Sequence, residues 1–324
     1  MLKRNRKTVM GHPKRQNSEA VGPQIAVLDR IACPPPGQFK STLEARDTPA
    51  LITGVMDSWP ALQRWTPDEI ARRYGDLEFL TTLHTPTTGR PYEKVAQNFR
   101  RAMTLGAFVD HMRSTDLPCY IRRQIISKWD GATADFDFES LFPHDPQDKR
   151  AYVWFGANTL TPMHFDMSNG ILCQLYGTKR IYAVSPADSA RLYPYAHSCT
   201  KSPVLPSAPD LQSFPDYADV TLYEGRLNRG EVLFLPTGWW HSIVAEGPSV
   251  SVSREFDQNM RWSDVWRALS AGGSAAWRAT ARDFVWHGLL KRPYQRMLFD
   301  DPPMGVLLYD AVAGGVSRRL RRGV

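Results

Sequence analysis

Between residues 118 and 256 the chain is a series of short apolar runs broken by Pro, Gly, Asn and Asp, and this pattern constrains the fold most. The runs are Cys119–Arg122, Ala151–Gly156, Ile171–Tyr176, Arg180–Val184, Val220–Tyr223, Val232–Leu235, His241–Ala245 and Ser249–Arg254. In the last run Ser and Val alternate strictly, as expected for a strand with one polar and one buried face. Many short strands separated by turn residues favour an antiparallel sandwich or barrel. We therefore predict a mainly β core, with residues 185–219 as a Pro-rich insertion.

Helical signals lie on both sides of this region. Thr66-Pro67-Asp68-Glu69 is the clearest helix start: Thr66 can cap, Pro67 suits the first helical position, and Glu69 completes a capping box. Trp262, Val265, Trp266 and Leu269 follow helical spacing after the last strand-like run. We predict four parts: a basic disordered tail (1–23), α/β elements packed on the core (24–117), the β core (118–258), and a helical segment with a basic tail (259–324).

The formal net charge of +7 is concentrated at the two ends of the chain. The basic residues of these ends are Lys3, Arg4, Arg6, Lys7, Lys14, Arg15, Arg318, Arg319, Arg321 and Arg322. Because the body between them is nearly neutral, we expect solvated tails and no nucleic-acid partner. No apolar run approaches the roughly 20 residues that span a bilayer, and no signal peptide is visible. The length of the apolar runs therefore predicts no membrane partner. The four cysteines lack CxxC spacing, so a reducing, cytoplasmic location is predicted.

A His-x-Asp pair and a distant histidine form the candidate metal site. His164 and Asp166 lie two residues apart, so on a strand they point to the same side. His241 follows the apolar run Val232–Leu235 and a Pro-Thr-Gly-Trp-Trp bend. Two histidines and one carboxylate on one face are the ligands of the non-haem Fe(II) facial triad. A His-x-Asp pair alone is a weak signal, so the prediction depends on its surroundings.

Lys179 lies on a strand-like run shortly after the His-x-Asp pair. A lysine that faces a barrel interior needs an anionic partner, because an unpaired buried ammonium is costly. A surface lysine at a strand end explains the local sequence equally well.

Several motifs in order carry a family resemblance: Thr-Pro-Met-His-Phe-Asp (161–166), Gly-Thr-Lys-Arg-Ile-Tyr (177–182), Leu-Tyr-Pro-Tyr (192–195), Phe-Pro-Asp-Tyr (214–217) and Gly-Glu-Val-Leu-Phe-Leu-Pro-Thr-Gly-Trp-Trp-His (230–241). Across roughly residues 25–256 the chain resembles the JmjC-type, cupin-like family of Fe(II)- and 2-oxoglutarate-dependent oxygenases. The resemblance is closest to the protein hydroxylase branch typified by the asparaginyl hydroxylase of hypoxia-inducible factor. It implies a double-stranded β-helix (jelly-roll, cupin-like) core with N-terminal α/β elements and C-terminal helices.

The resemblance also implies roles for individual residues. His164, Asp166 and His241 would bind Fe(II) as the catalytic metal ligands, and Lys179, Thr161 and Tyr120 would hold the distal carboxylate of the cosubstrate 2-oxoglutarate; dioxygen is the co-reactant. The sequence departs from the branch at two places. Gly170 stands where an Asn is frequent, with Asn169 one position earlier, and Arg254-Glu255-Phe256 replaces an Asn-Phe-Trp ending. Asn169 and Arg254 are therefore the candidate substrate contacts.

The predicted reaction is hydroxylation of a side chain in a protein or peptide, with release of succinate and CO2. A small-molecule hydroxylase is the first alternative, and the two departures leave room for it. A lysine demethylase would share the triad, but no reader domain or chromatin-type charge pattern accompanies it. A non-catalytic cupin used for binding would show a broken triad, and this one is intact. The resemblance further implies a possible homodimer through the C-terminal helices.

Overall fold

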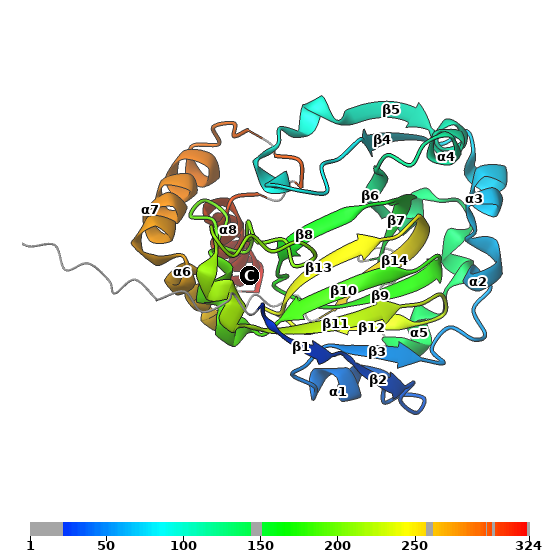
Figure 1. Ribbon diagram of the computed structural model, residues 1–324, viewed down its shortest axis with the longest axis horizontal. Coiled ribbons are helices and arrows are strands. Elements are labelled where there is room, and N and C mark those ends of the chain that lie inside the picture. The colour runs from blue at the N-terminus through cyan, green and yellow to red at the C-terminus, as the bar shows by residue number, and fades with distance from the viewer. Residues whose placement is uncertain (1–21, 144–150, 257–261, 296, 300–301, 323–324) are drawn as a thin grey trace, which may run out of the picture.

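Two β-sheets form the body of the protein, as the computed structural model shows for residues 22–143, 151–256, 262–295, 297–299 and 302–322 (Figure 1). The smaller sheet has the strand order β1 (Gln24–Val27), β11 (Thr221–Leu227), β10 (Lys179–Val184), β13 (Trp240–Ala245), β8 (Leu160–His164). The larger sheet has the order β2 (Asp29–Ala32), β3 (Ala50–Thr53), β12 (Val232–Leu235), β9 (Asn169–Tyr176), β14 (Pro248–Phe256), β7 (Ala151–Ala157), β6 (Cys119–Ile125), β4 (Glu78–Leu83), β5 (Arg100–Thr104). Neighbouring strands are antiparallel except β1–β11 and β2–β3. The predicted mainly β, jelly-roll core is confirmed.

The alternation of side chains along β10 shows how the sheets are packed. Ile181 and Ala183 point between the sheets, into a cluster with Leu172 of β9 and Leu233 of β12. Tyr182 and Val184 of β10 belong instead to a cluster on the outer face of the smaller sheet. Because successive side chains of a strand point to opposite faces, Lys179 shares the inward face of β10.

Helices cover the outer faces of both sheets. A large aromatic and aliphatic cluster joins the larger sheet to α1 (Phe39–Glu44), α2 (Ala61–Arg64), α3 (Pro67–Tyr74), α4 (Leu105–Ser114) and α5 (Phe138–Leu141). The smaller sheet packs against α6 (Trp262–Ala271), α7 (Gly273–Asp283) and α8 (Met304–Arg322), with a π-helical turn at Phe284–Leu289. Short 3-10 turns occupy Pro91–Glu93, Ala96–Asn98, Ile126–Lys128, Ala132–Asp135, Pro186–Leu192 and Pro215–Asp219. In the described part of the chain, no helix has the length and hydropathy to cross a membrane.

The helix start predicted at Thr66 is present, although only half of the capping box forms. The Thr66 hydroxyl accepts a hydrogen bond from the Glu69 backbone N–H at 3.3 Å, and Pro67 is the first helical residue. The Glu69 carboxylate instead pairs with Arg72 at 2.7 Å, one turn further along the helix. The helical spacing predicted after residue 259 is also present, with Val265 buried and Trp266 exposed.

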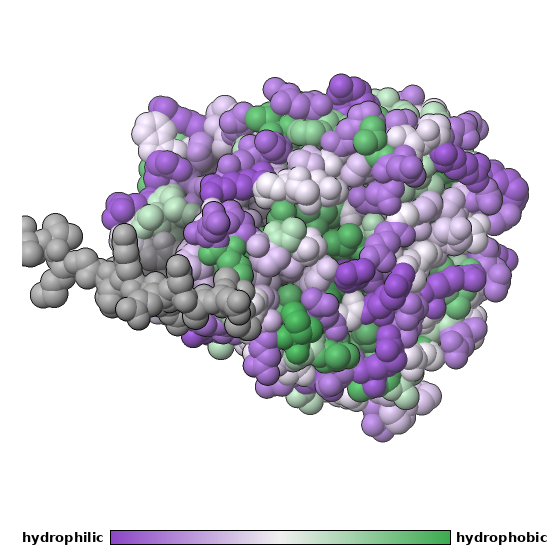
Figure 2. Space-filling view, viewed as in Figure 1, coloured by the Kyte–Doolittle hydropathy of each residue, from purple (hydrophilic) through white to green (hydrophobic). Residues whose placement is uncertain are grey.

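The smaller sheet ends in an apolar edge. Ile25 and Val27 of β1 are exposed, and Figure 2 shows hydrophobic residues gathered at the lower side of the molecule, where β1 lies. The predicted tail at residues 1–23 lies almost entirely outside the described residues, and the four predicted domain boundaries stay a prediction.

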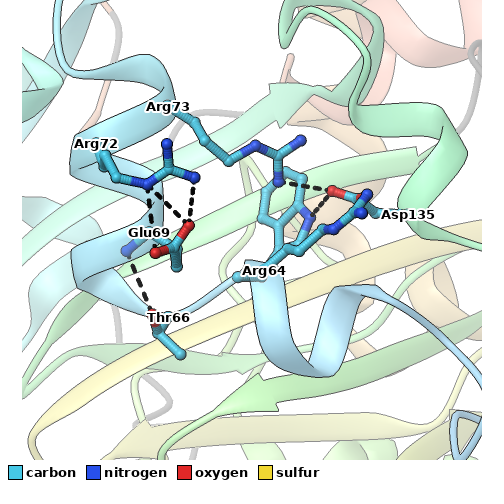
Figure 3. Close-up of polar contacts among 7 residues, drawn as sticks. Arg64, Thr66, Glu69, Arg72, Arg73 and Asp135 are labelled. Carbon is cyan, nitrogen blue, oxygen red and sulfur yellow. Dashed lines mark hydrogen bonds and ion pairs between the residues drawn. The ribbon is translucent and has the colours of Figure 1, made fainter.

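A buried carboxylate joins the N-terminal helices to the segment before α5 (Figure 3). The fully buried Asp135 accepts hydrogen bonds from Arg64 at 2.9 Å, Arg73 at 2.7 Å and the Trp65 indole at 2.9 Å. Burial alone would raise the pKa of Asp135, but these three donors outweigh it and hold the pKa below its ordinary value. The interaction therefore stabilises the fold while Asp135 is ionised.

We expect Asp135→Asn to lower the free energy of unfolding by about 2 kcal/mol at pH 7, because the negative charge that three donors stabilise is lost. The loss is limited to this size because Arg64 and Arg73 are partly exposed and water can still solvate them. The depressed pKa makes this contribution fully present above the unfolded-state value of 3.8 and lost as the pH falls through the lower folded-state value. Denaturant unfolding at pH 7 and at pH 3 measures the difference. Glu69→Gln, which removes the exposed ion pair with Arg72 on α3, is the control and should leave the free energy of unfolding nearly unchanged. Equal effects of the two substitutions would contradict this account.

Candidate metal centre and adjoining cavity

The pairing of β8 with β13 brings the three predicted metal ligands together. His164 and His241 are directly opposed in this antiparallel pair, and their ring centroids are 4.2 Å apart. The Asp166 carboxylate oxygens lie 3.9 Å from His164 Nε2 and 3.7 Å from His241 Nε2. One ligand atom from each residue lies within 4.8 Å of the others. These distances are too long for good hydrogen bonds but suit atoms that share one ion.

Backbone contacts orient both imidazole rings. His164 Nδ1 lies 2.9 Å from the Pro162 carbonyl oxygen, and His241 Nδ1 lies 3.0 Å from that of Trp239. A carbonyl oxygen only accepts, so each Nδ1 carries the proton and each Nε2 keeps a lone pair for a ligand. Burial, with a smaller effect of nearby His164, lowers the pKa of His241 to about 4. His241 is therefore neutral at physiological pH, the form that binds a metal.

The turn between β12 and β13 contacts Asp166, the carboxylate member of the triad. Gly238 has a φ of 82°, which favours glycine, and its N–H donates to the Asp166 carbonyl oxygen at 2.9 Å. The Asn169 side-chain oxygen accepts from the Thr237 N–H at 2.9 Å and from the Thr237 hydroxyl at 3.1 Å. Asn169 thus ties the start of β9 to the turn that precedes His241.

A cavity of about 370 Å³ opens beside the triad and is lined by most of the predicted site residues. Of these, the lining includes Tyr120, Thr161, His164, Asp166, Lys179, His241 and Arg254. Leu172, Leu235 and Ile243 supply apolar wall between the polar groups. The side chain of Asp166 is 53% exposed, whereas that of His241 is 4% exposed, so the centre opens to solvent on the Asp166 side.

Lys179 is buried at the cavity wall. Its ammonium donates to the Ser251 hydroxyl at 2.6 Å, and no carboxylate of the described residues pairs with it. Burial lowers its pKa from 10.5 to about 7. Of the two readings left open by the sequence, the inward lysine is the one observed. An anionic ligand in the cavity would satisfy this cation.

Tyr120 and Thr161 lie on neighbouring walls of the same cavity, and their side chains are hydrogen-bonded to each other. Burial raises the pKa of the Tyr120 phenol, and the bond to Thr161 offsets this only in part. The phenol is therefore a neutral hydrogen-bonding group on the wall of the cavity that Lys179 also lines.

The two candidate substrate contacts have different surroundings. Asn169 makes the turn contacts described above, and its neighbour Gly170 lines the cavity. Arg254 is fully buried on β14, with its guanidinium 5.3 Å from the Phe138 ring centroid and 5.0 Å from that of Phe142. A substrate contact by either residue stays a prediction.

The cavity wall also carries charged residues that were not anticipated from the sequence. Arg122, Arg123 and Glu255 line the cavity, and Arg123 pairs with Glu255 at 2.9 Å. Arg123 has a φ of 48°, and the β6–β7 register shifts between Ile121 and Gln124. Such a bulge re-aims side chains, and it leaves no pattern in the local sequence that would have shown it.

Comparison with known proteins agrees with this geometry. A family model described as a cupin-like domain matches residues 36–261, so the chain belongs to the cupin-like domain family. The relatives to which the chain is similar include JmjC proteins, which are described next.

Three curated relatives illustrate the range of similarity. The chain is 28% identical over 235 residues to "Lysine-specific demethylase 8" of Xenopus tropicalis, covering 70% of this chain and 52% of the relative. It is 26% identical over 249 residues to "Jumonji C domain-containing protein 5" of Drosophila melanogaster, covering 70% and 59%. It is 26% identical over 241 residues to "tRNA wybutosine-synthesizing protein 5" of Gallus gallus, covering 67% and 72%. The chain thus spans little more than half of the first two relatives.

We expect the ligand-free, metal-free protein to gain stability relative to Lys179→Met as the pH rises from 7 to 9. The unfolded lysine keeps its proton to about pH 10.5, whereas the folded one loses it near pH 7, so the unfolded state binds more protons in this window. The gain should reach at most about 1.4 kcal/mol per pH unit. Parallel urea denaturation of both proteins across this range measures it. A pH-independent difference would contradict the prediction, because folded Lys179 would then keep its proton throughout this range.

Proposed function

We propose that the protein is an Fe(II)- and 2-oxoglutarate-dependent hydroxylase of a side chain in a protein or peptide. The observation that carries the proposal is the shared cavity: a triad of metal-ligand type and a buried lysine without a carboxylate partner among the described residues line the same space. The overall reaction converts a C–H bond, dioxygen and 2-oxoglutarate into an alcohol, succinate and CO2.

The site residues fit both groups. His164, Asp166 and His241 would hold the iron, with Nε2 of each ring and the carboxylate already facing one another. Lys179, Thr161 and Tyr120 would bind the distal carboxylate of 2-oxoglutarate through one ammonium and two hydroxyl groups. The bound iron and cosubstrate supply the activation of dioxygen that attack on an unactivated C–H bond requires.

The remaining work falls to the chain's own residues. The Pro162 and Trp239 carbonyl oxygens accept hydrogen bonds from Nδ1 of His164 and His241. They thereby orient the Nε2 atom of each ring toward the position that the metal would occupy. Leu172, Leu235 and Ile243 exclude water from the cavity wall. The exposed side of Asp166 leaves the approach from which a substrate can reach the centre.

A protein or peptide substrate is favoured by the resemblance to the protein hydroxylase branch, although the particular asparaginyl hydroxylase branch has no relative among those named above. Lysine demethylation is the second candidate, because a relative is named as a lysine-specific demethylase. The two reactions give different products: hydroxylation adds one oxygen to the substrate, whereas demethylation removes a methyl group. A succinate-release assay on a panel of peptides, followed by mass spectrometry of the peptides, distinguishes the two reactions. Free amino acids are included to test the small-molecule alternative. A tRNA substrate is included because one relative is named as a tRNA wybutosine-synthesizing protein.

We expect Asp166→Ala to lower the affinity for a divalent metal more than about 100-fold, because even second-layer contacts of metal ligands change it by 10–100-fold. Isothermal titration of the chelator-treated protein with Mn(II) measures this, and 2-oxoglutarate-dependent succinate release should fall to background. Asp110→Ala, at an exposed position of α4, is the matched control and should retain both properties. Metal binding and succinate release by Asp166→Ala at the level of the control would contradict the proposed function.

The C-terminal helices are where we propose a homodimer contact. The exposed large apolar side chains of this region are Trp262, Trp266, Trp277, Val285, Trp286, Leu289, Leu290 and Val312. Trp266 of α6 and Trp277 of α7 form an edge-to-face pair at 5.0 Å, so the patch continues across both helices. Contiguous exposed apolar surface of this kind is typical of an interaction site.

We expect sedimentation of the wild-type protein to show a concentration-dependent dimer, and Trp266→Glu to shift it to the monomer by placing a charge in the contact. Leu117→Glu is the control, since Leu117 is 50% exposed but lies far along the chain from these helices. A monomeric wild-type protein at all concentrations, or equal behaviour of both variants, would contradict the dimer.

A further inference from the structure

A chain of hydrogen bonds runs behind Lys179, on the side away from the cavity. The Lys179 ammonium donates to Ser251 Oγ at 2.6 Å, and Ser251 Oγ donates to Gln174 Oε1 at 2.7 Å. Gln174 Nε2 in turn donates to the Tyr176 carbonyl oxygen at 2.7 Å and to Ser249 Oγ at 3.0 Å. Gln174, Ser249 and Ser251 are all buried, so water does not compete for these bonds. We call Gln174 and Ser251, the two neutral side chains behind Lys179, the lysine relay.

The relay has a single direction. The Tyr176 carbonyl oxygen can only accept, so it fixes the Gln174 amide with its N–H2 group toward β9 and its oxygen toward Ser251. That oxygen can only accept as well, so the Ser251 proton points to it. A lone pair of Ser251 Oγ is then left for the ammonium of Lys179. An amide flip would place two oxygens face to face and is disfavoured.

The relay is also electrically neutral. It accepts a hydrogen bond from one of the three N–H groups of the ammonium and supplies no negative charge to pair with it. A carboxylate in place of Gln174 or Ser251 would satisfy the lysine within the protein. A neutral acceptor instead holds the side chain in one position and leaves its charge for a ligand in the cavity that Lys179 lines.

We propose that Gln174 and Ser251 are positioning residues for the cosubstrate, which aim the Lys179 ammonium at the distal carboxylate of a 2-oxo dicarboxylic acid. The proposal rests on the proposed function, because it names the group that Lys179 meets. Neither residue touches the ligand in this account, and both act through Lys179. Losing the relay should therefore weaken recognition of the distal carboxylate and leave the metal-chelating end of the ligand unaffected.

Two ligands separate these effects. 2-Oxoglutarate carries the distal carboxylate, and 2-oxopentanoate has the same carbon chain and 2-oxo acid group without it. Equilibrium binding of each to the Mn(II)-loaded protein, measured anaerobically by isothermal titration, gives a ratio of the two dissociation constants. General damage to the fold weakens the binding of both ligands, whereas loss of lysine positioning weakens the binding of 2-oxoglutarate alone.

We expect Gln174→Met and Ser251→Ala each to reduce this preference about tenfold, the equivalent of roughly 1.4 kcal/mol for one buried hydrogen bond. Binding of 2-oxopentanoate should change less than about twofold, a shift of under roughly 0.5 kcal/mol. Ser202→Ala removes a buried serine hydroxyl that bonds to the Leu192 carbonyl outside the cavity, and it should keep the wild-type ratio. Circular dichroism and Mn(II) affinity confirm that each variant is folded and loaded.

The outcomes distinguish this proposal from the one on which it rests. If the wild-type protein shows no metal-dependent preference for 2-oxoglutarate, the proposed function fails. If the wild type shows the preference and Gln174→Met and Ser251→Ala retain it, the function stands and the relay proposal is overturned. Equal weakening of both ligands in the two variants would also overturn it, because the relay would then be structural only.

Discussion

The antiparallel pairing of β8 with β13 is the interaction on which the candidate site depends. It places His164 opposite His241 and carries Asp166 past the end of β8 to the same side. The Pro162 carbonyl oxygen of β8 and the Trp239 carbonyl oxygen just before β13 then leave the Nε2 atoms of His164 and His241 free to bind a ligand. Each ring is thus oriented by a backbone oxygen two residues before it, and the Asn169 side chain supports the turn that precedes His241.

The two sheets and the outer helices enclose the cavity beside the triad. Closure of the two sheets buries Lys179 on the wall of the same cavity. The Ser251 hydroxyl offsets part of the cost of burying its charge, and an anion in the cavity would offset the rest. The outer helices stabilise this arrangement from both sides, through the aromatic cluster on the larger sheet and the cluster under α6 to α8. The triad and Lys179 therefore line one cavity that also has apolar walls.

Much of this could be predicted from the sequence, because the signals were local. The eight strand-like runs, the Thr66 helix start and the His-x-Asp pair depend on spacing along the chain, and all of them appear in the structure. The direction of Lys179 was open, because its local sequence suits a surface and an interior lysine equally. Only the sheet pairing, with Ile181 and Ala183 in the inner cluster, shows that Lys179 points inward.

Other features could not be predicted because they depend on distant segments. The burial of Arg254 between two rings requires α5 to pack against β14. The role of Gln174 requires the register of β9 against β14, where it lies opposite Ser251. The alternating serines of β14 did indicate a polar face, but that face lines the interior, where Ser249 and Ser251 are buried.

The central claim is that metal and cosubstrate share one site, and the most direct test is the coupling between them. Anaerobic titration of the wild-type protein with 2-oxoglutarate, with and without Mn(II), measures how far each ligand changes the affinity for the other. The account predicts that the metal tightens 2-oxoglutarate binding, and that 2-oxoglutarate tightens metal binding by the same factor, as linkage requires. Affinities that are independent of one another would contradict it, because the triad and Lys179 would then not act on one bound ligand.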